Sequence, residues 1–195
     1  MESILPMPTL ISHGIATTAL ITCFPKRAVP RRLMVAAIIC SIVPDIDVVG
    51  YQFGLRHGEL LGHRGVTHSI LFAVILATAA FQFVLPTLDR AVNRSLVWTY
   101  LFLATASHGL LDALTDRSGL GIPFFWPFDN TRYFFPFAPI AMSPIGASFF
   151  SERGWLTLLS EARWVWIPSL VFALSAISVR YFLSARSAQH RLSSN

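Results

Sequence analysis

The sequence predicts an all-α fold, an integral membrane helical bundle of four or five transmembrane helices with an interfacial loop rich in proline and aromatic residues. Hydrophobic residues make up 54% and charged residues 13% of the 195 residues. A soluble protein carries about twice that share of charge. The mean hydropathy is +0.59. Because the apolar residues also stand in long blocks, we expect a single membrane domain over residues 1–195.

Five apolar segments are candidates for crossing the membrane, which requires about 20 predominantly apolar residues in a helix. They are residues 7–24, 33–43, 66–85, 95–114 and 164–183. The third and the fifth are the clearest spans. The second is short and ends at Pro44, so it can be tilted or can span only in part.

The lysine and arginine residues predict how the chain is oriented. If every segment crosses, the basic connections at residues 26–32, 90–94 and 180–191 share one side of the membrane. The positive-inside rule places that side in the cytoplasm. We therefore expect the N-terminus outside and the C-terminus in the cytoplasm. The first segment lacks the basic start and the cleavage site of a signal peptide, so it should be retained as a helix.

Residues 116–163 combine prolines with clusters of aromatic residues. Six prolines occur from Pro123 to Pro168, and aromatic residues crowd positions 124–128 and 133–137. Proline interrupts helices, and aromatic side chains favour the headgroup region of a bilayer. We expect the first half of this segment to form a loop that lies on the membrane or folds over a site.

Ionisable residues inside membrane helices are costly, so they are functional candidates by default. Seven such residues lie in or beside the first four apolar segments. They are His13, Asp45, Asp47, His63, His68, His108 and Asp112.

Local sequence predicts how some of these side chains point. Pro44 should end the second helix, and in an extended stretch both Asp45 and Asp47 would face one centre. His108 and Asp112 are four residues apart and share a helical face. Thr67 or Ser69 can cap the third helix.

The order of the segments predicts that these side chains meet. With alternating crossings, the start of the first helix, the end of the second, the start of the third and the end of the fourth reach one membrane face. At about 1.5 Å per residue, His13 and His108 each lie ~9 Å in from that end of their helices. Chance placement would scatter such residues over both faces.

Mixed imidazole and carboxylate ligands suit a divalent metal, Zn²⁺ first and also Mn²⁺ or Fe²⁺, as one or two ions. We assign all seven residues as candidate ligands, and Asp47 and His68 as catalytic, with Asp47 acting as a ligand or as a general base. Arg64 and Arg117 can bind an anionic group of a substrate.

Each assignment has a structural alternative. His13 can be a satisfied polar residue between helices, and His108 with Asp112 can be a hydrogen-bonded pair that locks helices together. Asp45 and Asp47 can form a hydrated helix end. Surface solubility explains Arg64 and Arg117 equally well.

Three segments carry a resemblance to a known family. Residues 44–47 (PDID), 63–69 (HRGVTHS) and 108–115 (HGLLDALT) resemble the YdjM (LexA-regulated) family of bacterial inner-membrane metal-dependent hydrolases. Gly121, Pro127 and Phe128 look like the stretch that follows the last motif in that family. The resemblance covers residues 7–130, the helical core with the metal site. Residues 131–195 then hold the interfacial loop and the C-terminal transmembrane helix.

The resemblance implies a multi-pass protein of the bacterial inner membrane with hydrolase activity. The order of His, Asp, His and HxxxD is also similar to zinc-dependent phospholipase C and P1 nuclease, which suggests phosphoester substrates. A counterpart of the N-terminal Trp ligand of that group is missing, so a trinuclear site is not expected. We predict a membrane-bound hydrolase that acts on a phosphoester or lipid at the outer, periplasmic interface through metal-activated water.

The expected partners are membrane lipids, with a phospholipid or other phosphoester as the substrate. Nucleic acid is not expected, because the arginines stand singly or in short groups between apolar blocks. Two other functions remain open. A metal or ion transporter would place its site near the midplane, often on broken helices in repeated halves. A non-catalytic scaffold would use the polar cluster only to hold helices together.

Overall fold

The computed structural model describes residues 8–24, 29–89, 92–115, 120–144 and 146–193. Within these residues the chain is helical and forms no strand; its only β-type pairs are isolated bridges, Thr115 with Ile140 and Ile122 with Tyr133. The predicted all-α class is therefore confirmed.

The helical elements follow one another along the whole described chain. Those labelled η are 3₁₀ turns, except η8, which is a π turn. The elements are α1 Leu10–Leu20, η1 Ile21–Cys23, α2 Arg31–Ile42, η3 Val43–Phe53, η4 Val66–His68, α3 Ile70–Val84, η5 Leu85–Thr87, α4 Arg94–Ala113, η7 Gly146–Phe150, α5 Glu152–Glu161, η8 Ala162–Trp166 and α6 Ile167–Ser193.

Each of the five predicted apolar segments contains a helix. Among the described residues, three helical stretches are long and apolar enough to cross a membrane, namely Arg31–Phe53, Ile70–Thr87 and Glu152–Arg186, and Leu10–Cys23 is a shorter apolar helix. Helix α4 has 20 residues, a length of about 30 Å that matches the hydrocarbon core. This is the helical membrane bundle that the composition predicts.

The expectation of an extended stretch after Pro44 is wrong. Helix α2 ends at Ile42, as predicted, but the chain continues directly as the 3₁₀ helix η3. Pro44 lies in the first turn of η3, where its missing N–H has no partner to lose. In a 3₁₀ helix, residues two apart point in different directions, so Asp45 and Asp47 approach different nitrogens of His68, Nε2 and Nδ1 respectively.

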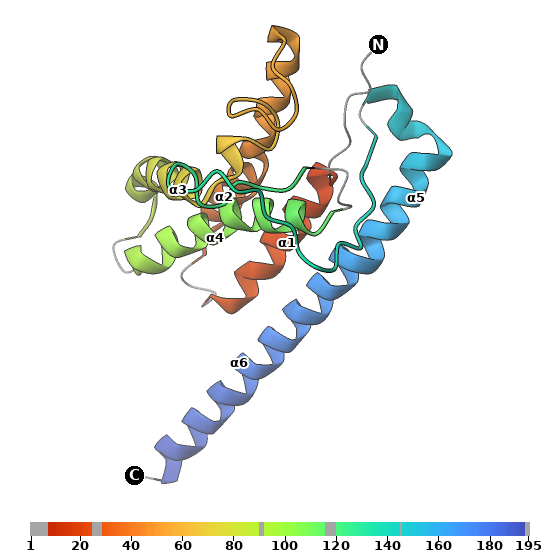
Figure 1. The fold of residues 1–195 in the computed structure, drawn as a ribbon. Helices are drawn as coiled ribbons and strands as arrows, with labels where there is room; N and C mark the ends of the chain where they lie inside the picture. Colours follow the sequence, from red (N-terminus) through yellow and green to blue (C-terminus); the bar gives the residue numbers. More distant parts are fainter. Residues whose placement is uncertain (1–7, 25–28, 90–91, 116–119, 145, 194–195) are drawn as a thin grey trace.

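The C-terminal helix begins earlier than the sequence predicts. Residues from Glu152 are helical, and α5, η8 and α6 run on as one continuous helix rather than starting near residue 164. The loop of the Pro-rich segment is thus confined to its first half. Figure 1 shows α1 to α4 grouped together, while α6 runs beside α1 and projects away from the group to the C-terminus.

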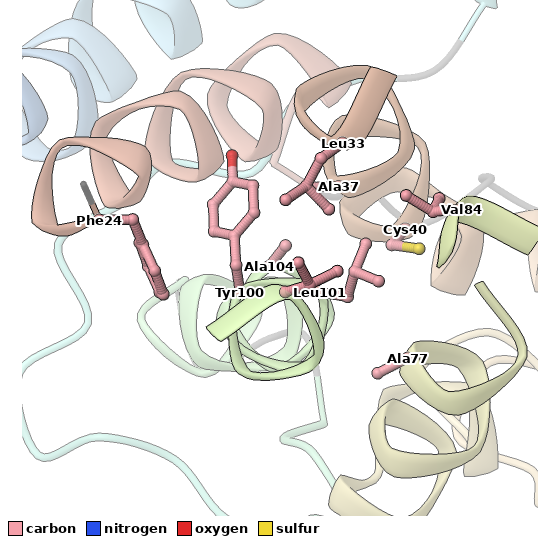
Figure 2. Packing of buried hydrophobic residues seen from close by; sticks show 10 residues of the cluster. Phe24, Leu33, Ala37, Cys40, Ala77, Val84, Tyr100, Leu101 and Ala104 are labelled. Atoms are coloured by element: carbon pink, nitrogen blue, oxygen red, sulfur yellow. The ribbon is translucent and has the colours of Figure 1, made fainter. Parts of the chain in front are cut away.

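Helix α4 lies at the centre of the bundle, in contact with α1, α2 and α3. Figure 2 shows its residues Tyr100, Leu101 and Ala104 packed against α2 and α3. Ala37 and Ala77 on those helices are fully buried. Such small side chains let membrane helices approach closely, and this close packing fixes the positions of the helix ends.

A buried carboxyl group joins the long C-terminal helix to α1. Glu161 is 0% exposed, and its oxygens accept hydrogen bonds from the N–H of Thr9 (2.6 Å), the hydroxyl of Thr9 (2.5 Å) and the hydroxyl of Ser12 (2.7 Å). The indole N–H of Trp166 also donates to the Ser12 hydroxyl, at 2.8 Å. These bonds hold the first turn of α1 against α5 and η8.

We predict that Glu161→Ala lowers the free energy of unfolding by about 2–4 kcal/mol, because it leaves buried donors of Thr9 and Ser12 without an acceptor. Unfolding in detergent, followed by circular dichroism, measures this. The matched control is Glu152→Ala at an exposed position of the same helix, expected to stay within about 0.5 kcal/mol of wild type. Equal stability of the two variants would contradict the prediction.

Candidate metal centre

The structure brings the seven candidate residues together at one end of the bundle. They come from the start of α1, from η3, from η4 and the loop before it, and from the last turns of α4. All of them are buried, with exposed fractions of 9% or less. Arg117 lies outside the described residues.

Four of these side chains form what we call the central group, Asp45, His68, His108 and Asp112. Their potential ligand atoms all lie within 4.8 Å of one another. The Nε2 atoms of His68 and His108 are 3.0 Å apart. An oxygen of Asp112 lies 3.1 Å from Nε2 of His68, and an oxygen of Asp45 lies 3.3 Å from Nε2 of His108. Two imidazole nitrogens and two carboxylates thus surround one point.

The other nitrogen of each imidazole is held by the protein. Nδ1 of His108 lies 2.7 Å from the carbonyl oxygen of Ser41. Because a carbonyl only accepts, Nδ1 carries the proton and Nε2 keeps its lone pair for the central group. Nδ1 of His68 lies 3.0 Å from the hydroxyl of Thr67 and 3.3 Å from an oxygen of Asp47. Both rings therefore turn Nε2 toward the same point.

The central group fits a divalent cation. Both oxygens of Asp45 and both of Asp112 are buried and make no hydrogen bond. Buried carboxylates without donors are costly, and so are two nitrogen lone pairs directed at each other. A cation bound by both carboxylates and both Nε2 atoms removes these costs, and two His with two Asp is a ligand set that Zn²⁺, Mn²⁺ or Fe²⁺ accepts.

The charges around His68 also favour a bound cation. Oxygens of Asp112 and Asp45 lie 3.1 and 3.7 Å from its Nε2, and an oxygen of Asp47 lies 3.3 Å from its Nδ1. The surroundings of this ring therefore favour a positive charge, which a proton or a metal ion can supply.

A second cluster, the flanking group, consists of Asp47, His63 and His68. Here Asp47 is already satisfied by the protein: one oxygen lies 2.7 Å from Nδ1 of His63, and the other accepts from the Thr67 hydroxyl at 2.5 Å. Asp47 differs in this from the two carboxylates of the central group. Its geometry favours a role in orienting the rings of His63 and His68 over direct metal binding.

His13 lies against the central group without belonging to it. Its ring stacks on that of His108, with centroids 3.9 Å apart, and its Nε2 lies 3.6 Å from Asp112. Neither of its nitrogens makes a hydrogen bond. His13 therefore contacts His108 and Asp112 without a hydrogen bond, which differs from a polar residue whose hydrogen bonds are satisfied between helices.

Arg64 is buried rather than on the surface. It is 1% exposed, and its Nε lies 3.4 Å from an oxygen of Asp112. Its backbone is left-handed, with φ of 60°, a conformation that is uncommon for any residue other than glycine. Solubility therefore does not explain Arg64, whose guanidinium lies at the edge of the central group.

Sequence reasoning missed the residues that act through backbone contacts. Arg132 donates hydrogen bonds to the carbonyl oxygens of Gly58 (2.6 Å), Arg64 (3.1 Å) and Gly121 (2.9 Å). These bonds connect the loop before η4 to residues 120–144, which we call the aromatic loop. The carbonyl of Ser41 fixes His108 in the same way. Any residue type has a backbone carbonyl, so such contacts leave no pattern in the sequence.

The last turns of α4 and η4 lie unusually close together. A Cβ atom at Gly109 would stand 2.8 Å from the carbonyl oxygen of His68. The aromatic loop closes over the same place, since the N–H of Ile70 donates to the carbonyl of Phe124 at 2.9 Å. Glycine at position 109 therefore permits the approach that brings His108 and Asp112 to His68.

Fold and site together define a class: a multi-pass α-helical membrane protein with a buried His/Asp cluster that can bind a divalent metal. The chain belongs to the family described as YdjM inner membrane protein, whose model matches residues 7–187. The match extends beyond residue 130, where the recognisable motifs end, and includes most of the C-terminal helix.

A curated relative supports the same family and an inner-membrane location. Inner membrane protein YbcI of Escherichia coli (strain K12) is 34% identical over 173 residues, which cover 85% of this chain and 94% of the relative. No solved structure matches the chain.

We predict that His108→Ala and Asp112→Ala each abolish retention of metal by the purified protein, because each removes one of the four ligands of the central group. Metal per chain is measured by mass spectrometry after dialysis in detergent. His57→Ala is the matched control: His57 is half-buried and belongs to neither group. A metal-free wild type, or an Asp112→Ala protein as rich in metal as wild type, would reject the centre.

We predict that Gly109→Ala destabilises the protein by about 1–3 kcal/mol, since the added methyl group overpacks the contact with the His68 carbonyl. Metal retention should fall with it, because His68 must move. Gly14→Ala is the control, since its Cβ would meet only Ile38 at 3.9 Å. If both alanine variants unfold at the same denaturant concentration, close approach at Gly109 is not required.

Proposed function

We propose that this protein is a membrane-bound metal-dependent hydrolase that acts on a phosphoester or lipid at the outer, periplasmic interface of the inner membrane. In this proposal the N-terminus is outside and the C-terminus is cytoplasmic, and the central group holds one ion, Zn²⁺ first, with Mn²⁺ or Fe²⁺ as alternatives. The observation that carries the proposal is the pair of buried, hydrogen-bond-free carboxylates facing two imidazole Nε2 atoms.

The hydrogen-bond pattern argues against a purely structural role. A cluster that only holds helices together pairs its buried donors with acceptors, as native proteins do almost everywhere. Glu161 shows that pattern in this same bundle, since Thr9 and Ser12 satisfy it. Asp45, Asp112 and His13 do not show it. Such groups, which lie beside charged and imidazole side chains but make no hydrogen bond, are what a site that receives a ligand requires.

The residues around the ion have distinct roles in the proposal. When bound, the metal supplies a Lewis acid and activates water near neutral pH. Asp47 and Ser41 hold the rings of His68 and His108 in the binding orientation. Arg64, beside Asp112, places a guanidinium where an anionic phosphoryl group can be bound in two-point fashion.

The test is turnover of a panel of phospholipids and soluble phosphodiesters by the purified protein. We predict hydrolysis that chelation abolishes and added Zn²⁺ or Mn²⁺ restores. Loss of a residue that only orients a ligand costs roughly 10–100-fold in activity. His68→Ala and Asp112→Ala should reduce the rate of hydrolysis by more than this. Asp47→Asn should reduce the rate by an amount within this range and should retain part of the metal.

Other outcomes decide against hydrolysis. Uptake of metal into sealed vesicles without turnover would favour a transporter. A fully active Asp112→Ala protein would remove the central group from the reaction. If the folded wild type binds no metal, the cluster is left with a scaffold role.

A further inference from the structure

Four of the segments that carry candidate ligands also carry a large, exposed aliphatic side chain within two residues of a ligand position. Ile11 precedes His13 by two residues, Ile46 separates Asp45 from Asp47, Ile70 follows His68, and Leu110 lies between His108 and Asp112. These side chains are 53%, 67%, 39% and 46% exposed, respectively.

These four residues, which we call the aliphatic ring, lie at the level of the buried polar cluster on four different elements. A single exposed aliphatic residue on a soluble protein needs no explanation. Exposed aliphatic residues beside the candidate ligands of four elements are what a hydrocarbon environment requires, because lipid-facing positions are apolar. Their exposure is the pattern expected of a bundle that lipid surrounds at the height of the central group.

Helix lengths agree with this placement. Asp45 lies 14 residues beyond Arg31, and His108 lies 14 residues beyond Arg94. At about 1.5 Å per residue, His108 is ~21 Å from Arg94. Asp45 is ~23 Å from Arg31, because its last three residues belong to the longer-rising 3₁₀ helix η3. Tilt only shortens these distances across the bilayer. The hydrocarbon core is ~30 Å thick. If these arginines mark one boundary, the central group lies within the core.

Loops of the described residues cross the end of the bundle where the central group lies. Arg132 ties Gly58 and Arg64 to Gly121 across that end. Phe124 of the aromatic loop is hydrogen-bonded to the start of α3. These contacts hold described loops across that end of the bundle, while the exposed side chains of the aliphatic ring lie on its flanks.

We propose that the substrate is a membrane lipid with an anionic phosphoester, which reaches the central group sideways from the bilayer. This rests on the proposed function. In the hydrolysis, the oxygen of water bonds to phosphorus, the P–O bond to the alcohol breaks, and the alcohol oxygen takes up a proton. Arg64 supplies the positive charge for the phosphoryl group, and the lipid chain stays in the hydrocarbon beside the aliphatic ring.

The depth of the site is tested without any activity assay. Single cysteines replace Ile46 and Leu110 in a background that lacks Cys23 and Cys40, and each is spin-labelled in vesicles of phosphatidylethanolamine and phosphatidylglycerol. We expect both labels to collide with oxygen more than with a water-soluble nickel chelate, as a label at Val171 of α6 should. A label at Glu59 is the aqueous control. If positions 46 and 110 behave like Glu59, lateral access is overturned.

The substrate class is tested by comparing those vesicles with water-soluble glycerophosphodiesters that carry the same headgroups. We expect at least a tenfold preference for the lipid, with His68→Ala inactive toward both. Turnover of the soluble esters alone would overturn the lipid inference and leave the hydrolase proposal standing. No turnover of either by the metal-loaded protein would overturn both.

Discussion

The constraint on which this structure depends is the burial of two carboxylates, Asp45 and Asp112, beside two imidazoles in a membrane bundle. Removing such groups from water is costly unless an opposite charge compensates them. The protein itself provides part of that compensation, through Arg64 at 3.4 Å from Asp112. The remaining carboxylate oxygens have no hydrogen-bond donor, which makes the cluster a place where a cation stabilises the folded chain.

Helix α4 transmits this constraint to the rest of the bundle. It contacts α1, α2 and α3, and it carries both His108 and Asp112 at its far end. The small buried side chains of the core, together with Gly109, bring its last turns against η4. The position of the central group is thus set by helix packing, and the same contacts that stabilise the fold also align the ligands.

The periphery holds this arrangement in place by contacts to the backbone and by one buried acid. Arg132 joins two loops above the cluster, and Glu161 holds the first turn of α1, one residue before His13, against the C-terminal helix. The C-terminal third of the chain is therefore part of the structure that positions the site, in agreement with a family match that continues to residue 187.

The sequence by itself determined the membrane class, the five helical segments and the seven polar residues that gather at one end, because apolar length and residue type are visible in a single chain. It misjudged the stretch after Pro44, because proline also fits the first turn of a new helix. It placed the start of the last helix at the edge of the apolar segment, whereas the helix extends back through more polar residues to Glu152. Only the tertiary structure decided that Asp47 is hydrogen-bonded to His63 and Thr67 while Asp45 faces the central group, and that Arg64 is buried. Those distinctions depend on which atoms of neighbouring residues are in contact. The contacts are set by how the helices cross and by backbone carbonyl groups, neither of which can be read from residue types.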